Sequence, residues 1–425
     1  MDNIKKLYIS KFILSYLLFE SLLSYVVSII DIHRFASGPY TRAALIIFTF
    51  LYFSPEILKI KIRKQIQKKI IFFDGLVMLW VTVAVISFFI GLIYGNPTIY
   101  LLSDFVYIGF GGILYYIAKH NRNISFEISN FYLKRVGFII CFLLIIHLLL
   151  GIVPSSLLMV TTVAFIFTNV LKKNIIPASV MTVPYLLLVS TTNRTQLIIF
   201  LIMILVFALK LLRKKYNLNF IFMYVFLFTT IIYLFKVEIL EWLLKFFENN
   251  AMAYRINQLL IIFKEGIDYN SPYLLSVTQR IVEAELVINY WTTDILSFIF
   301  GSGSGGTIDG SKIFKDTGVL NTALLGSEKI HNIHLLPFAL IFRYGVFGLS
   351  LFVLLFFIIY KSFVRLMNEE RNNSTIVCTT FILLWIIYSM PAAAFLWSPP
   401  IFWLFLQGAI KDRLPQPSKT SSVLR

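Results

Sequence analysis

Long apolar runs separated by short polar segments dominate this chain and predict helices that cross a membrane. About 20 consecutive apolar residues span a bilayer as a helix, and shorter runs cross when the helix is tilted or broken. The expected spans cover residues 12–30, 43–58, 70–94, 98–118, 136–153, 157–171, 175–192, 196–212, 217–235, 335–360, 375–392 and 394–410. The pattern therefore predicts an all-α polytopic membrane protein with about 12 transmembrane helices.

One long polar segment, residues 236–334, interrupts the apolar pattern. Apolar residues recur in it at helical spacing, so we expect two or three amphipathic helices lying on the outer face of the membrane. The predicted organisation is transmembrane helices 1–9 in 1–235, one large extracytoplasmic loop in 236–334, helices 10–12 in 335–410, and a cytoplasmic tail in 411–425.

Composition supports the membrane class, because 58% of the residues are hydrophobic and only 14% are charged. The net charge of +17 suggests a nucleic-acid-binding protein. However, most of the basic residues are concentrated on one predicted side of the membrane. Of the 38 Lys and Arg residues, 26 fall in segments predicted to share one side of the membrane: 1–11, 59–69, 119–135, 172–174, 210–216, 361–371 and 411–425. This is the positive-inside pattern. It predicts that both termini are cytoplasmic, and it argues against a nucleic-acid partner.

The polar segment contains a glycine–serine run, Gly301-Ser302-Gly303-Ser304-Gly305-Gly306, which spells G-x-G-x-x-G. A dinucleotide site needs this motif between a strand and a helix of a βαβ unit. No such unit surrounds the run, and no Lys-Ser/Thr pair follows it as in a P-loop. We expect a flexible turn between an outer helix and a loop.

His331 and His334 are three residues apart near the end of the polar segment. On a helix they would share a face. A zinc pair needs further ligands nearby, and only scattered acidic residues are present. The alternatives are a plain interfacial pair and a general base, since histidine titrates near working pH.

Three arginines are candidates for phosphate binding, because a guanidinium binds phosphate bidentately. Arg194 lies at the predicted outer end of a span, where it could also reach lipid headgroups. Arg255 and Arg280 fall in the polar segment. On the polar face of an interfacial helix each could simply be solvated.

Four ionisable residues fall within predicted spans, namely Glu20, Asp74, Asp104 and His147. Such groups face a cavity or a partner far more often than lipid. They are consistent with a proton relay in a transporter, or with structural hydrogen bonds.

Three stretches resemble the O-antigen polymerase/ligase superfamily, which includes Wzy-type polymerases and WaaL-type ligases. Thr192-Asn193-Arg194-Thr195 is similar to the family's Ser-x-Arg-Thr stretch. Arg280, followed by a helix and Gly301-Ser302-Gly303, is similar to its Arg, helix and Gly-x-Gly run. His334 precedes Gly345-Val346-Phe347-Gly348 at the spacing of the His-Asn-x9-Gly-x-x-Gly signature.

The resemblance has one departure and one further match. Leu335 follows His334, where the pattern has Asn, Ser or Gln, while the His-Asn dipeptide occurs at His331-Asn332. His331 is therefore the second choice for the base. Arg255 is separated by ten residues from Gly266, which is similar to an Arg-x10-Gly pattern of polymerase outer loops.

The resemblance implies a bacterial surface polysaccharide polymerase, for O-antigen or capsule, in the cytoplasmic (inner) membrane. Glycan would move from undecaprenyl pyrophosphate onto a lipid-linked repeat unit at the outer face. His334, Arg280 and Arg194 would be catalytic, and Arg255, His331 and Asn332 would bind substrate. No metal or cofactor is implied. The partners would be the undecaprenyl-pyrophosphate-linked oligosaccharide, membrane lipid, a chain-length regulator and a flippase.

Two alternatives stay open. An O-antigen ligase of the same superfamily would transfer the glycan to lipid A core. A polysaccharide flippase or transporter would need charged central spans and similar halves, and the chain shows no internal repeat.

Overall fold

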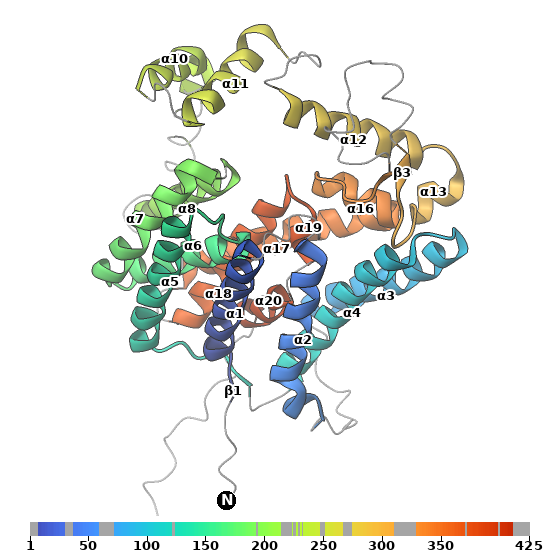
Figure 1. Ribbon diagram of the computed structural model, residues 1–425, viewed down its shortest axis with the longest axis horizontal. Coiled ribbons are helices and arrows are strands. Elements are labelled where there is room, and N and C mark those ends of the chain that lie inside the picture. Colours follow the sequence, from blue (N-terminus) through green and yellow to red (C-terminus); the bar gives the residue numbers. More distant parts are fainter. Residues whose placement is uncertain are drawn as a thin grey trace, which may run out of the picture.

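The computed structural model describes residues 7–29, 37–58, 72–120, 124–192, 194–213, 223, 227, 230–231, 233–246, 251–266, 274–309, 329–369, 372–397 and 400–410. Helices dominate this part of the chain (Figure 1). They are α1 (Ile9–Ile29), α2 (Ser37–Leu58), α3 (Phe72–Ile93), α4 (Thr98–His120), α5 (Asn130–Leu150), α6 (Ser156–Leu171), α7 (Ile175–Thr192), α8 (Arg194–Arg213), α10 (Lys236–Phe246), α11 (Ala251–Glu265), α12 (Leu275–Trp291), α13 (Ile295–Phe300), α16 (Leu336–Tyr344), α17 (Val346–Asn368), α18 (Asn373–Ser389), α19 (Ala394–Trp397) and α20 (Ile401–Ile410). The strands are β1 (Leu7–Tyr8), β2 (Ile124–Ser125), β3 (Ile308–Asp309) and β4 (Lys329–Ile330).

Helices α6, α18 and α20 form the centre of the bundle, where they are buried on nearly every side. Helix α18 packs against α6, α17 and α20. The rings of Phe381 and Phe405 stack with their centroids 3.9 Å apart. A helix that is apolar all round must be buried or face lipid, and these three have become the core.

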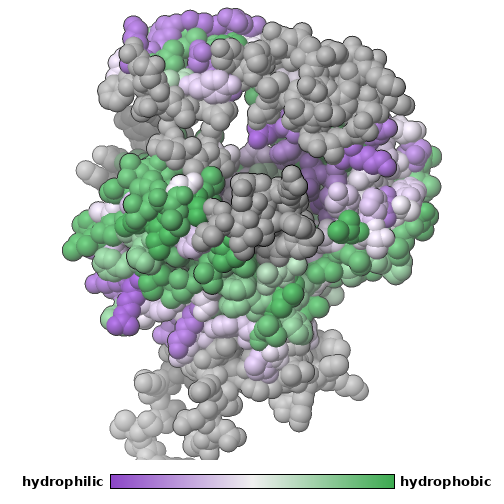
Figure 2. Space-filling model, viewed as in Figure 1, coloured by the Kyte–Doolittle hydropathy of each residue, from purple (hydrophilic) through white to green (hydrophobic). Residues whose placement is uncertain are grey.

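The outer helices combine a buried stripe with an exposed apolar face. On α17, Leu351, Leu355 and Ile358 are buried, whereas Val353 and Phe356 are about half exposed. An exposed apolar face of this length is unfavourable in water, so this face of α17 contacts lipid. Figure 2 shows hydrophobic residues gathered in a band across the middle of the visible face.

Six described helices are long and apolar enough to cross a membrane, and four shorter apolar helices accompany them. The chain is therefore an all-α, multi-pass membrane protein, as the sequence predicts. The number of twelve spans and the extent of the outer loop stay predictions.

One predicted span, 335–360, is not a single helix. It breaks at Gly345, which has φ +57°, and the two pieces α16 and α17 pack against each other. A Cβ at Gly345 would lie 2.5 Å from the carbonyl of Ile299. Only glycine permits both the positive φ and this close approach. The predicted span 394–410 is likewise divided into α19 and α20.

The described part of the polar segment holds four helices, α10 to α13, which lie at one end of the bundle (Figure 1), and the two short strands β3 and β4. Helices α10 and α11 pack as a pair, with Lys264 Nζ 2.5 Å from Glu241 Oε1. Helix α11 also contacts α7, and α12 packs on α16. We call this end the loop end.

At the opposite end, strand pairing and one lysine side chain join segments that are far apart in the sequence. Strands β1 and β2 pair in parallel, with Leu7 opposite Ile124. Lys210 Nζ donates hydrogen bonds to the carbonyl oxygens of Leu366 at 2.5 Å and Glu369 at 2.6 Å. The ammonium group thus stabilises the C-terminal end of α17.

Candidate functional site at the loop end

His334 lies at the loop end, two residues before α16, and a buried carboxylate holds its ring. His334 Nδ1 is 2.8 Å and 3.0 Å from the two carboxylate oxygens of Glu283 on α12. The His334 backbone N–H donates to the same group at 2.9 Å. The side chain of Glu283 is 1% exposed and that of His334 is 43% exposed. Among the described residues, Nε2 of His334 makes no hydrogen bond.

Arg280 lies one turn before Glu283 on the same face of α12. Its Nε is buried and has no hydrogen-bond partner in the described part of the chain. A buried, unpaired guanidinium N–H is unfavourable. An anionic ligand would supply the missing acceptor.

His331 is in a different situation, since it is 8% exposed and both ring nitrogens face protein acceptors. Nδ1 lies 2.9 Å from the carbonyl oxygen of Gly306, and Nε2 lies 3.6 Å from Oδ1 of Asp104. The ring stacks on Tyr100, with centroids 4.2 Å apart. Residues 331–333 are not helical, so the expectation that the two histidines share a helical face does not hold.

A buried ion pair lies beneath His331. Arg343 Nη2 on α16 is 3.1 Å from Oδ1 of Asp104 on α4, and both side chains are 5% exposed. The other carboxylate oxygen of Asp104 accepts the N–H of Gly305 at 3.0 Å. The sequence analysis did not single out Arg343, although an arginine within an apolar run is itself a signal of a buried partner.

The glycine–serine run forms turns, as predicted, and it is buried and hydrogen-bonded to other segments. The amide of Asn96 donates to the carbonyl oxygens of Ser302 and Ser304, each at 2.9 Å. Ser302 N–H donates to Phe342, and Ser304 N–H donates to Ser87. With the N–H of Gly305 on Asp104, these donors are already used, and the run is not arranged as a phosphate cradle.

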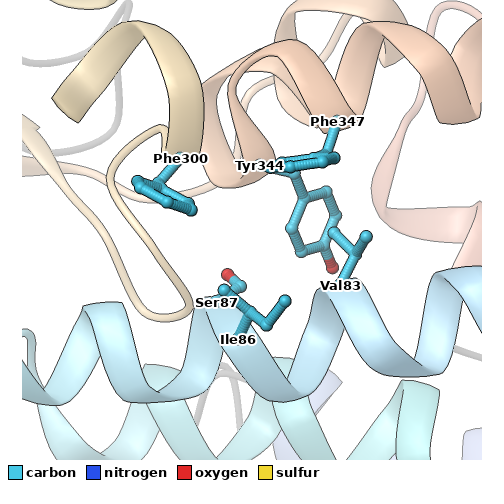
Figure 3. A pocket seen from close by; sticks show the side chains of 6 residues that line it. All are labelled: Val83, Ile86, Ser87, Phe300, Tyr344 and Phe347. Atoms are coloured by element: carbon cyan, nitrogen blue, oxygen red, sulfur yellow. The ribbon is translucent and has the colours of Figure 1, made fainter. Parts of the chain in front are cut away.

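A small pocket lies beside this run, between α3 and the ends of α13 and α16 (Figure 3). Its lining consists of Val83, Ile86, Ser87, Phe300, Tyr344 and Phe347. The hydroxyl of Ser87 is already engaged by Ser304 and by the carbonyl of Arg343. No set of polar groups converges in it, so we do not place chemistry there.

The remaining predicted site residues are only partly described. Arg194 is the first residue of α8 and Arg255 lies on α11, and the side chains of both are outside the described part. Asn332 is exposed between two buried neighbours. Among the described residues, no group of three or more His, Cys, Asp and Glu could hold a metal ion.

Two of the ionisable residues within predicted spans, Asp74 and Asp104, form separate pairs. Asp74 pairs with Lys119 at 2.5 Å and accepts from Tyr115 at 3.0 Å. Asp104 pairs with Arg343. Asp74 lies in the first turn of α3 and Asp104 lies near the start of α4, so the two pairs are at opposite ends of this helix pair.

Glu283, like Arg343, could not be singled out from the sequence. In the sequence, Glu283 is one of several polar residues on an expected interfacial helix, and its contact with His334 joins positions 51 apart.

A comparison with protein-family models finds no match for the chain, and none of the curated proteins matches it.

Proposed function

We propose that this protein is a membrane-embedded glycosyltransferase that polymerises a bacterial surface polysaccharide. The observation that carries the proposal is the arrangement of three residues on the loop end. His334, 43% exposed, is held by buried Glu283, and Glu283 lies one turn from Arg280, whose Nε has no partner among the described residues. This combination offers a base beside an anion-binding group, which is what transfer from a lipid pyrophosphate requires.

The distribution of charge supports placing this site outside the cytoplasm. Segment 236–333 holds 8 basic and 11 acidic residues, whereas the basic clusters fall in segments predicted at the opposite end. Two contacts between described residues each join segments that are predicted to lie on the same side of the membrane. Ala393 N–H donates to the carbonyl of His334 at one end, and Leu7 pairs with Ile124 at the other. Twelve spans with both termini cytoplasmic remain the topology that we propose.

The proposed reaction uses a glycan on undecaprenyl pyrophosphate as donor and a lipid-linked repeat unit as acceptor. His334 takes the proton from an acceptor hydroxyl, and that oxygen attacks the anomeric carbon of the donor. The bond from this carbon to the pyrophosphate oxygen breaks, and the pyrophosphate leaves with both electrons. Arg280 and Arg194 stabilise the negative charge that develops on it. Arg194 also begins α8, where the helix dipole favours an anion.

The other substrate-binding predictions are revised by the geometry. His331 is engaged with Gly306 and stacked on Tyr100, so we assign it a structural role and His334 the role of base. Exposed Asn332 and Arg255 on α11 stay candidates for contacts with the glycan. A chain-length regulator and a flippase remain the proposed protein partners.

The test is the surface-glycan profile of a deletion strain complemented with variants. Arg194→Ala, Arg280→Ala and His334→Ala should each abolish long chains at normal protein level. Arg213→Ala, an exposed arginine at the other end of α8, is the matched control and should restore them. Normal chains in all three site variants would overturn the proposal.

The same strain separates polymerase from ligase. Loss of a polymerase leaves single repeat units on lipid A core. Loss of a ligase leaves finished polymer on the lipid carrier, and a flippase defect leaves undecaprenyl-linked repeat units facing the cytoplasm.

A further inference from the structure

We infer that Glu283 is a positioning residue that fixes the tautomer of His334 and makes Nε2 the atom that accepts the proton. The inference rests on the proposed function for its catalytic meaning. Its structural content, which nitrogen of His334 carries the proton and why, stands on the geometry alone.

Three nitrogen atoms surround the carboxylate of Glu283, and two of them are N–H donors whatever the tautomer of His334. His334 contributes Nδ1 at 2.8 Å and its backbone N at 2.9 Å, and Gln279 contributes Nε2 at 3.1 Å. An ionised carboxylate has only acceptor sites, so it accepts all three. Nδ1 of His334 must therefore carry a proton.

The other ring nitrogen of His334, Nε2, is then unprotonated. A neutral imidazole carries one N–H, so a proton on Nδ1 leaves a lone pair on Nε2. The ring of His334 is held on the Nδ1 side, and its side chain is 43% exposed. The free lone pair is thus the one presented to a substrate, which is the arrangement that a general base needs.

Glu283 and His334 are both held in place by the surrounding backbone. Glu283 lies within α12, and α12 packs on α16. The carbonyl oxygen of His334 accepts from Ala393 at 2.8 Å, and Leu336 N–H donates to Met390 at 2.9 Å. The backbone on both sides of the contact is therefore fixed. A dry, fixed carboxylate orients a histidine better than a mobile one.

Replacing Glu283 by Gln makes a sharp test because it conserves size and removes one acceptor. The amide oxygen can satisfy the backbone N–H of His334, and the amide NH₂ then faces Nδ1. A donor facing Nδ1 forces that atom to accept, so the proton moves to Nε2. The variant would then present N–H, and not a lone pair, to the acceptor hydroxyl.

The experiment uses the full chain in lipid nanodiscs with ¹⁵N-labelled histidine. The chain has five histidines, so a His334→Asn sample assigns the His334 signals. Wild type should show a proton on Nδ1 and Glu283→Gln a proton on Nε2. With an undecaprenyl-pyrophosphate-linked glycan, the variant should lose about 100-fold in kcat or more while KM stays close to wild type. Glu283→Asp, which keeps the charge, should recover part of kcat.

Two further variants complete the design. Glu285→Gln changes an exposed glutamate on the same helix and should alter neither the tautomer nor kcat. Gln279→Leu removes one donor from Glu283 and should cause a smaller loss of kcat, even if Glu283→Gln folds poorly.

The outcomes separate this inference from the proposed function. An unchanged tautomer or an unchanged kcat in Glu283→Gln would overturn the positioning role. If the wild-type protein transfers no glycan but the tautomer moves as expected, the proposed function fails and the relation between Glu283 and His334 stands.

Discussion

The guanidinium of Arg343 lies 3.1 Å from the carboxylate of Asp104, with both side chains almost completely buried. The pair joins α16 to α4, and the same carboxylate holds the N–H of Gly305. The ion pair therefore connects the glycine–serine run to the segment that carries His331 and His334. The site at the loop end depends on this buried contact, although neither charge touches the proposed substrate.

Breaking the pair should destabilise the protein strongly. Asp104→Asn removes the carboxylate that pairs with the buried guanidinium of Arg343, and breaking a buried ion pair from one side costs about 3–5 kcal/mol. Thermal unfolding in a fixed detergent would report the loss. The exposed pair Lys264–Glu241 supplies the control, since Lys264→Ala should leave the melting temperature at the wild-type value. Equal melting temperatures for the two variants would contradict a structural role for Asp104.

Gly303 should not tolerate a side chain. Its φ is +74°, and a Cβ there would lie 2.5 Å from the backbone nitrogen of Gly91, which cannot move aside easily. Gly303→Ala should therefore lower both stability and the yield of folded protein. Gly151→Ala is the matched control, because Gly151 has φ +65° but nothing within 4 Å of the added Cβ.

The two alanine variants isolate the cost of contact from the cost of backbone strain. Gly151→Ala should lower the free energy of unfolding only by the cost of the left-handed conformation, about 1–2 kcal/mol. Gly303→Ala adds the clash with α3. Similar free energies of unfolding for both would show that the close approach to Gly91 is unimportant.

Local pattern predicted the helices well, because apolar runs of this length have few other stable forms in a membrane. It did not predict the break at Gly345. A glycine inside an apolar run is common in transmembrane helices, and the need for positive φ comes from the close approach of Ile299 in another segment. The burial of the turn at 301–306 could not be predicted for the same reason, since its partners are Ser87, Asn96 and Phe342.

The candidate site was predictable only where a residue type suggests its own chemistry. Histidine and arginine in a polar outer segment are candidate site residues by their type alone, and the sequence analysis predicts both His334 and Arg280. Glu283 and Arg343 became significant through partners far away in the sequence. The choice between His331 and His334 also needed structure, since burial distinguishes them and sequence does not.

Asp294 should make the start of α13 sensitive to acid. It is the N-cap of that helix, and hydrogen bonds from the backbone N–H and then the hydroxyl of Ser297 hold the pKa of Asp294 below its usual value. A depressed folded-state pKa contributes stability above the unfolded pKa of about 3.9. That stability is lost as pH falls through the folded-state pKa.

Hydrogen exchange of residues 295–300, corrected for intrinsic rate, would measure this effect. Protection should fall as pH decreases below about 4. Asp294→Asn, which keeps a capping oxygen but cannot titrate, should show protection that does not change over this range. Identical pH dependence in both proteins would exclude Asp294 as the cause.

Arg280 should bind the pyrophosphate of the donor through two parallel hydrogen bonds, because its Nε is buried and lacks an acceptor in the described part of the chain. A lysine keeps the charge but presents a point ammonium and not a planar fork. Binding of undecaprenyl pyrophosphate to nanodisc-embedded protein should therefore weaken about tenfold or more in Arg280→Lys, given about 1.5–3 kcal/mol for a charge-assisted hydrogen bond. Arg280→Ala should weaken it further, and inorganic pyrophosphate should compete in wild type only. If Arg280→Lys bound the lipid as tightly as wild type, the guanidinium would be acting as a simple positive charge, and the unpaired Nε would need another explanation.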